Sequence, residues 1–212
     1  PAPIYKDASA RELVSNFAKE ERVNILLSTV DWEMQEDGSY RFFGISVLFN
    51  PDGEIAGRYN KIFLIPFGES IPGSTWFTSW AAWLREMIPN ISEFEAGREF
   101  TAMPIGDVKI SAPICFDGFS PEIIQKMVLN GANLIVLSGN LAWFGKSNAA
   151  DYLEMITRWR SLENRVPVVF ATNSGYSLYW DAGGQVLTKR TELFEEGHLS
   201  AVMELAAYNS LY

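Results

Sequence analysis

Cysteine and histidine are almost missing from this chain of 212 residues, which contains one of each, Cys115 and His198. A single cysteine cannot form a disulfide within the chain, so cysteine content does not decide between a reducing and an oxidising compartment. The pair also supplies too few ligands for the sites that zinc prefers. We therefore expect neither a metal ion nor another cofactor.

Basic residues and long apolar runs are scarce as well. The chain has 17 Lys and Arg against 26 Asp and Glu, for a net charge of −9. This charge would repel a polyanion, and no basic cluster occurs. We therefore do not expect nucleic acid as a partner. No apolar run reaches the roughly 18 residues of a membrane-spanning helix, and no signal peptide is present.

The chain begins at Pro1-Ala2-Pro3, without an initiator methionine. We interpret it as a fragment or as a processed chain.

Aromatic residues, by contrast, are abundant: 14 Phe, 8 Tyr and 7 Trp. Most such rings fill cores, but some line apolar grooves or meet membrane surfaces. Residues 75–88 are predicted to form a helix that carries many of them. We expect a mobile, partly apolar arm there, because an ordinary surface helix would not expose so many rings. The rings in question are Trp76, Phe77, Trp80 and Trp83.

The hydrophobic pattern predicts strands and helices that alternate in the middle of the chain, with hairpins on both sides. Helices are predicted at residues 7–20, 75–88, 120–130 and 149–164. Strands are predicted at residues 23–30, 41–49, 54–59, 98–103, 107–115, 133–138, 167–172, 176–181, 185–190 and 197–204. This order favours one α/β domain with a mixed sheet, or with two sheets, under helices.

Cys115 ends one of the predicted strands and precedes a predicted helix. Reactive side chains collect at the carboxyl ends of strands in α/β folds, and a helix N-terminus stabilises a thiolate. The alternative is a small buried hydrophobic residue. Position alone does not decide between a nucleophile and a core residue.

A cysteine nucleophile also needs a partner that takes up or stabilises charge. His198 is the one possible histidine base, but nothing beside it resembles the rest of a triad, and we interpret it as structural. Lys61 is the other candidate, because a nearby ammonium lowers a thiol pKa and stabilises an oxyanion. A solvated surface lysine is the alternative.

Several short blocks make the chain resemble the nitrilase, or carbon–nitrogen hydrolase, superfamily, and within it the apolipoprotein N-acyltransferases. These blocks keep the order and the approximate spacing of that branch. They are Tyr59-Asn60-Lys61, Pro66-Phe67-Gly68-Glu69, Ile114-Cys115-Phe116-Asp117, Asn140-Leu141-Ala142-Trp143-Phe144-Gly145 and Ala171-Thr172-Asn173-Ser174-Gly175.

The resemblance implies an αββα sandwich, with two mixed sheets between layers of helices. Residues 1–212 would form a nitrilase-like catalytic domain without its opening strand–helix–strand and without any transmembrane helices. It also implies a Glu–Lys–Cys triad whose general-base glutamate lies outside the given sequence. The enzyme would lie in the bacterial inner membrane, with this domain facing the periplasm or the cell exterior.

The implied reaction moves a fatty acyl chain from a phospholipid, through a Cys115 thioester, to the N-terminal amine of a diacylglyceryl-cysteine lipoprotein. Lys61 would face the oxyanion, and Glu69 would orient Lys61 or assist the base. Four further residues match positions near the substrate: Phe116, Asp117, Asn140 and Trp143. The family's Tyr and Glu after the nucleophile are replaced here by Phe116 and Asp117.

Two other functions stay open at this point. The chain could be a soluble amidase of the same superfamily. It could also be a catalytically degenerate domain that binds lipid or lipoprotein, although the presence of Lys61, Glu69 and Cys115 argues against that.

Overall fold

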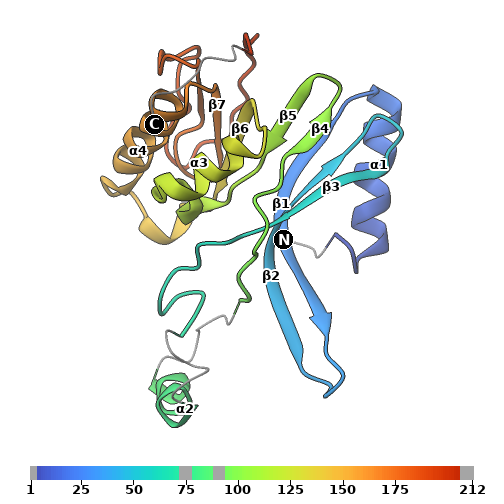
Figure 1. The fold of residues 1–212 in the computed structure, drawn as a ribbon, viewed down its shortest axis with the longest axis vertical. Helices are drawn as coiled ribbons and strands as arrows, with labels where there is room; N and C mark the ends of the chain where they lie inside the picture. Colours follow the sequence, from blue (N-terminus) through green and yellow to red (C-terminus); the bar gives the residue numbers. More distant parts are fainter. Residues whose placement is uncertain (1–3, 72–77, 88–93, 206–212) are drawn as a thin grey trace.

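Two β-sheets lie face to face between helices in the computed structural model, which describes residues 4–71, 78–87 and 94–205 (Figure 1). The smaller sheet is antiparallel and contains, in order, β1 (Ile25–Met34), β2 (Tyr40–Phe49) and β3 (Ile55–Asn60). The larger sheet is mixed and contains, in order, β4 (Met103–Ile105), β5 (Val108–Ser111), β6 (Leu134–Gly139), β7 (Val168–Thr172) and β8 (Leu178–Trp180).

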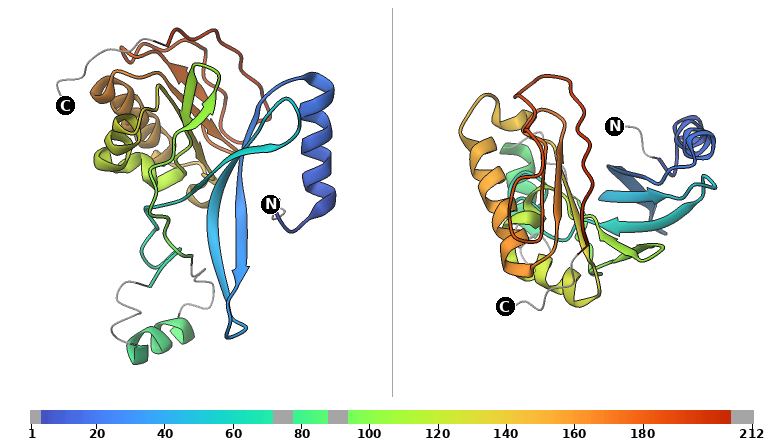
Figure 2. Two further views of the ribbon diagram at one scale, coloured as in Figure 1. Left: turned by 45° about the vertical axis from the view of Figure 1, so that its right-hand side comes forward. Right: turned by 90° about the horizontal axis from the view of Figure 1, so that it is seen from above.

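Helices cover the outer face of each sheet. Helix α1 (Ala8–Glu21) lies on the smaller sheet, whereas α3 (Pro121–Leu129) and α4 (Ala149–Asn164) lie on the larger one. The right-hand view of Figure 2 shows the layers in order: α1, the smaller sheet, the larger sheet, and the α3 and α4 layer. The predicted αββα sandwich is confirmed.

Strand β2 shows how the sequence builds two cores from one strand. Alternate residues point to opposite faces of a sheet. Ile45, Val47 and Phe49 pack toward α1 in a small outer core, whereas Leu48 joins the main core between the sheets. This central strand is apolar on both faces because both of its faces are covered.

Serine hydroxyls add a polar bridge between the two sheets. The Ser28 Oγ lies 2.8 Å from the Ser46 Oγ and 2.6 Å from the Ser138 Oγ. Ser46 also donates to the carbonyl of Ala112 at 2.9 Å. Because β1 and β2 belong to one sheet and β6 to the other, these bonds fix how the sheets stack.

Local signals set most of the observed boundaries. Asp7 caps α1 by accepting from the N–H of Ala10 at 3.1 Å. Ser120 caps α3, and Pro121 occupies its first turn, where a missing N–H has no cost. The predicted turn between β2 and β3 forms at Asn50–Gly53, with Gly53 at φ +73°.

Three of the predicted strands are wrong. Residues 98–103 are irregular except for Met103, because the β4–β5 hairpin is short and turns at Gly106. Residues 185–190 pair only through the Trp180–Val186 bridge. Residues 197–204 pair with no strand that the structure describes, and Val202 is 95% exposed. An apolar alternation forms a strand only when a partner backbone is available to it.

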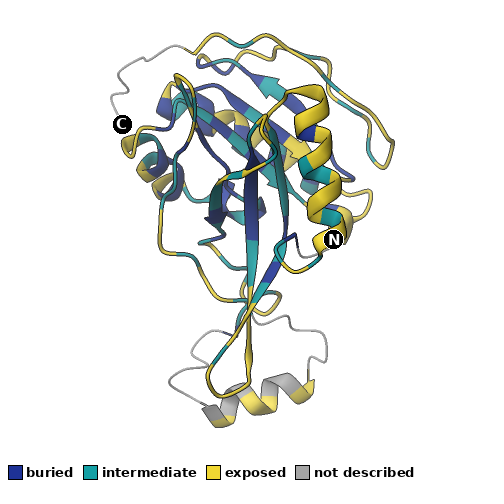
Figure 3. Ribbon diagram, turned by 90° about the vertical axis from the view of Figure 1, so that its right-hand side faces the viewer, coloured by how far each residue is buried: buried dark blue, intermediate teal, exposed yellow. Residues whose placement is uncertain are grey.

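Helix α2 (Thr78–Met87) lies apart from the sandwich, at the bottom of Figure 3. Trp83 is exposed, as the prediction of an apolar arm requires. Trp76 and Phe77 lie outside the described residues, and the side chain of Trp80 is not among those described. Across the described ranges, no helix combines the length and apolarity needed to cross a bilayer.

Candidate active site

Strands β5, β6 and β7 run parallel, so their carboxyl ends meet at one edge of the larger sheet. Cys115 follows β5, Asn140 follows β6 and Asn173 follows β7; we call this the carboxyl edge. An isolated bridge between Ile114 and Ser138 continues the β5–β6 pairing to the residue before Cys115. The topology therefore places the only cysteine where α/β folds carry reactive groups.

Cys115 begins a 3₁₀ turn, η1 (Cys115–Phe119), instead of ending a strand as the sequence suggested. Its φ is +51°, in the left-handed region that a residue with a side chain rarely occupies. Such a conformation costs about 1–2 kcal/mol. The side chain is only 9% exposed. Strain of this kind at a reactive residue is typical of a functional site.

Lys61 lies directly after β3 and is 2% exposed. Its Nζ donates to both carboxylate oxygens of Glu69 at 2.6 Å. Glu69 is held in turn by the N–H of Ile65 at 2.9 Å. On the backbone, the Lys61 N–H donates to Gly44 at 2.8 Å, and the Lys61 carbonyl accepts from Gly97 at 2.7 Å. The ammonium is thus buried, paired and fixed in position, unlike a solvated surface lysine.

The charges around the thiol act in both directions. Burial raises the pKa of Cys115 above its ordinary value, the Lys61 ammonium lowers it, and Glu69 raises it again. The N–H of Phe116 also lowers the pKa of the thiol, and Asp117 raises it. Lys61 is therefore the group that most favours the thiolate in this site. His198 is exposed and is not among the groups that act on the thiol.

Asp117 belongs to the same 3₁₀ turn as Cys115 and is fully buried, with 0% exposure. Its two carboxylate oxygens accept hydrogen bonds from Tyr59, Ile62, Phe63 and Ile114. Burial raises the pKa of Asp117, whereas the bonds from Ile114, Phe63 and Tyr59 and the Lys61 charge lower it. The prediction that Asp117 contacts substrate does not fit this position, because the carboxylate faces protein donors alone.

The other predicted substrate residues lie on the loops of the same edge. Phe116 is half-buried and stacks on Phe119 with ring centroids 4.7 Å apart. Asn140 accepts from the Asn173 side chain at 3.0 Å, which ties the loops after β6 and β7 together. Trp143, in the short 3₁₀ turn η2 (Ala142–Phe144), is 86% exposed. The carboxyl edge unites these residues with Cys115.

The sequence reasoning did not single out Tyr59 or Asn173 as separate functional candidates. Both stood inside the blocks that carry the family resemblance, and Asn173 follows a predicted strand, as Cys115 does. Position after a strand was thus a usable signal for Asn173. The role of Tyr59 depends on a partner 58 residues away, which sequence spacing does not reveal.

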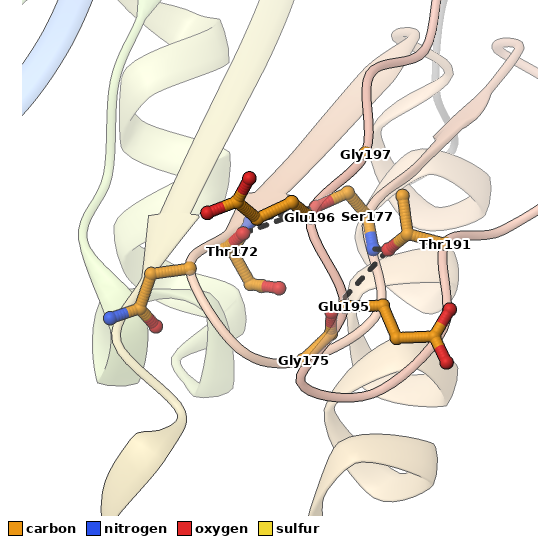
Figure 4. A pocket seen from close by; sticks show the side chains of 8 residues that line it. Thr172, Gly175, Ser177, Thr191, Glu195, Glu196 and Gly197 are labelled. Carbon is orange, nitrogen blue, oxygen red and sulfur yellow. Dashed lines mark hydrogen bonds between the residues drawn. The ribbon is translucent and has the colours of Figure 1, made fainter.

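A small polar pocket of about 220 Å³ lies beside the end of β7 (Figure 4). Hydroxyl, amide and carboxylate groups line it: Thr172, Asn173, Gly175, Ser177, Thr191, Glu195, Glu196 and Gly197. Ser177 and Thr191 brace its wall, since the Ser177 N–H donates to the Thr191 Oγ1 at 2.8 Å. Sites for apolar ligands are mostly larger and lined by apolar groups. We therefore do not assign an acyl chain to this pocket.

Metal binding finds no support in the part of the chain that the structure describes. No group of three or more histidine, cysteine or carboxylate side chains comes together there.

Solved structures share this fold. The crystal structure of a carbon–nitrogen hydrolase from Helicobacter pylori G27 matches with a TM-score of 0.68 at 20% identity, covering 89% of this chain and 64% of that one. An amidase from Nesterenkonia sp. matches with a TM-score of 0.65 at 17% identity, covering 92% and 66%. At these identities the likeness concerns the fold alone.

Relatives that are similar in sequence include the two that follow. An apolipoprotein N-acyltransferase of Geobacter metallireducens is 30% identical over 214 residues, covering 100% of this chain and 40% of that protein. One of Borreliella burgdorferi is 26% identical over 218 residues, covering 98% and 39%. The chain thus spans about two fifths of the length of these relatives. The carbon-nitrogen hydrolase family model matches residues 2–211, and the chain belongs to that family.

Proposed function

We propose that this chain is the catalytic domain of an enzyme that transfers a fatty acyl chain from a phospholipid to the N-terminal amine of a diacylglyceryl-cysteine lipoprotein. The observation that carries the proposal is the buried Lys61 ammonium, which lowers the pKa of the buried thiol of Cys115. The sequence similarity to the apolipoprotein N-acyltransferases supplies the substrate class.

In the first step the Cys115 sulfur attacks the carbonyl carbon of a phospholipid ester. The carbon–oxygen bond breaks, the lysophospholipid leaves as an alcohol with a proton, and the acyl chain stays on sulfur as a thioester. In the second step the α-amine of the lipoprotein attacks the thioester. The carbon–sulfur bond breaks, an amide forms and the thiol is restored. Lys61 stabilises the oxyanion in both steps.

The reaction also needs a group that accepts the thiol proton. A carboxylate with a free lone pair near the thiol could do this. Glu69 accepts both bonds from Lys61 and one from Ile65. Asp117 accepts from Tyr59, Ile62, Phe63 and Ile114. The four donors occupy all of the lone-pair positions of Asp117, whereas Glu69 keeps one free but is paired with the Lys61 ammonium. We assign the base to a glutamate outside residues 1–212, as the family resemblance implies.

Exposed apolar side chains on three segments support a lipid donor. The segments are the loop after β3 and helix α2, which extend below the sandwich in Figure 1, and the loop after β6. We call this set the apolar rim: Phe63, Phe67, Trp83, Met87, Trp143 and Phe144. Large apolar groups that stay exposed on loops and on a projecting helix are available to a partner. An acyl chain or a bilayer surface is the partner that this rim suits.

The proposed setting follows from the same chemistry. A phospholipid donor and a lipid-modified acceptor are both found at a membrane, and we propose the bacterial inner membrane, with this domain on the periplasmic or outer side. The polypeptide outside residues 1–212 would provide the membrane attachment.

The full-length protein, incubated with vesicles that contain a labelled phospholipid, tests the proposal. We expect a labelled protein adduct that hydroxylamine removes, since hydroxylamine cleaves thioesters. The Cys115→Ala variant should form no adduct. An intact protein that forms none, or an adduct that persists in Cys115→Ala, contradicts the proposal.

The two other functions give different results. An amidase would give no stable adduct from the phospholipid, and in a separate assay it would release ammonia from simple amides. A degenerate lipid-binding domain would retain the phospholipid uncleaved, without lysophospholipid release.

A further inference from the structure

One carboxylate joins the two segments that carry Lys61 and Cys115. The Asp117 Oδ1 accepts from the N–H groups of Ile62 at 3.2 Å and Phe63 at 2.7 Å, the two residues after Lys61. Its Oδ2 accepts from the N–H of Ile114 at 2.9 Å, the residue before Cys115. The segments are some 55 residues apart in sequence, so only tertiary structure brings them together.

The fourth donor is the hydroxyl of Tyr59, which lies 2.8 Å from the Asp117 Oδ2. Tyr59 and Asp117 are both 0% exposed. Burial and the neighbouring Asp117 charge raise the pKa of Tyr59, so this hydroxyl keeps its proton and donates. Tyr59 belongs to β3 and thus anchors the carboxylate to the smaller sheet.

Four donors on two oxygens require an acceptor-only group. An ionised carboxylate offers about four lone-pair positions, whereas an amide of the same shape replaces one oxygen with a donor. Each backbone N–H here is a donor that cannot reverse its role. Burying a carboxylate is expensive unless such bonds compensate it, and all four donors are needed here to compensate a carboxylate that is 0% exposed.

We propose that Asp117, held by Tyr59, is a positioning residue that fixes the Lys61 segment against the Cys115 turn. Asp117 bonds to the backbone of residues that flank Lys61 and Cys115, so it acts through the chain beside the two reacting residues. Measurements of acyl transfer test this inference only if the proposed function is right. Measurements of the reactivity of the Cys115 thiol test it independently of the proposed function.

If Asp117 acted only through its charge, its removal would shift the pKa of Cys115 in the opposite direction. The charged groups that act on the thiol are Lys61, Glu69 and Asp117. Removing the Asp117 charge in place would lower the pKa of Cys115, because that charge raises it. Losing the position of Lys61 would raise the pKa instead, since the ammonium lowers it. The sign of the change therefore separates the two roles.

The experiment measures the alkylation rate of Cys115 by iodoacetamide against pH in the full-length protein, with the modified peptide quantified by mass spectrometry. We expect the midpoint of Asp117→Asn to rise by about one pH unit, a typical size for a weakened charge contact. Tyr59→Phe keeps the carboxylate and should give a smaller rise. Acyl-adduct formation should slow by about 10- to 100-fold in Asp117→Asn, as expected for a displaced reacting group.

Ser161→Ala is the matched control, because it removes another fully buried hydroxyl, whose bond goes to the Asp181 carbonyl away from both segments. It should leave the midpoint unchanged. A lower or unchanged midpoint in Asp117→Asn overturns the proposal. If Asp117→Asn does not fold, Tyr59→Phe decides: a midpoint equal to that of Ser161→Ala overturns it. Absence of the acyl adduct in the unmutated protein would count against the proposed function alone.

Discussion

The buried groups around Cys115 and the apolar rim form two parts that are built in opposite ways. Around Cys115 the groups are buried, charged and bonded to one another: Lys61 to Glu69, and Asp117 to the backbone on both sides. The apolar rim, including Phe67, Trp83 and Trp143, is exposed. The first part is fixed, and the second is open to a partner.

This difference separates two tasks. Charge is stabilised best by groups that are already in place and shielded from water. Apolar contact needs only exposed area and tolerates a variable partner. Changes among the buried groups should therefore affect chemistry with any acyl donor. Changes in the rim should affect only how a lipid donor is captured.

Lys61→Met should have the largest effect. It removes the ammonium that lowers the thiol pKa and faces the oxyanion, so we expect acyl-adduct formation to fall by about 10²- to 10³-fold. The alkylation midpoint of Cys115 should rise. Lys126→Met is the control, because Lys126 pairs with Glu122 at the same 2.6 Å on the exposed face of α3. Equal losses in both variants would show that the buried pair has no special role.

Gly97→Ala should come next. A Cβ at Gly97 would lie 2.2 Å from the Asn60 carbonyl oxygen, so the backbone next to Lys61 must move. We expect a loss of about 1–3 kcal/mol in the free energy of unfolding, together with slower acylation. Denaturant unfolding and the adduct assay check this. At Gly197 the added Cβ meets nothing closer than 3.5 Å, so Gly197→Ala should change neither value. Unchanged acylation in a folded Gly97→Ala would contradict a fixed Lys61.

Trp143→Ala tests the rim. The ring is largely exposed, so its loss should leave the unfolding temperature and the alkylation midpoint unchanged. The phospholipid concentration for half-maximal acylation should rise by roughly 3- to 10-fold, the equivalent of about 1 kcal/mol of apolar contact. Trp159, exposed on α4, provides the control Trp159→Ala. If Trp143→Ala altered the alkylation midpoint of Cys115, the apolar rim and the buried groups would not have separate roles.

Glu69→Gln should give a small shift in thiol reactivity, opposite in sign to that of Lys61→Met. The Glu69 charge raises the pKa of Cys115, so its removal should move the alkylation midpoint to lower pH, by less than about one unit. Acyl transfer should nevertheless slow, because Lys61 loses its bidentate partner. A midpoint that moves to higher pH would mean that Glu69 acts mainly by placing Lys61.

The parts of the fold that rest on local chemistry could be predicted from the sequence. The cap at Asp7, the Ser120-Pro121 start of α3 and the turn at Asn50–Gly53 are set by residues within a few positions of each other. The αββα architecture was predicted from short sequence blocks that keep the order found in the nitrilase superfamily. The same blocks pointed to Cys115 and Lys61.

Features that depend on distant partners could not be predicted. Residues 185–190 and 197–204 alternate like strands but lack a continuous ladder. The left-handed turn at Cys115 breaks a pattern that looked like unbroken strand. Asp117 was predicted to lie near the substrate, yet it is buried, and three of its four donors come from residues 59–63, more than 50 positions away.

The most direct test of the account follows a single acyl group. The Cys115 acyl-enzyme is formed from phospholipid vesicles, freed of excess lipid, and mixed with a diacylglyceryl-cysteine peptide that has a free α-amine. The account predicts that the label moves from Cys115 to the peptide in a bond that resists hydroxylamine, as an amide does. Release of the label as free fatty acid, with the peptide unmodified, would contradict it.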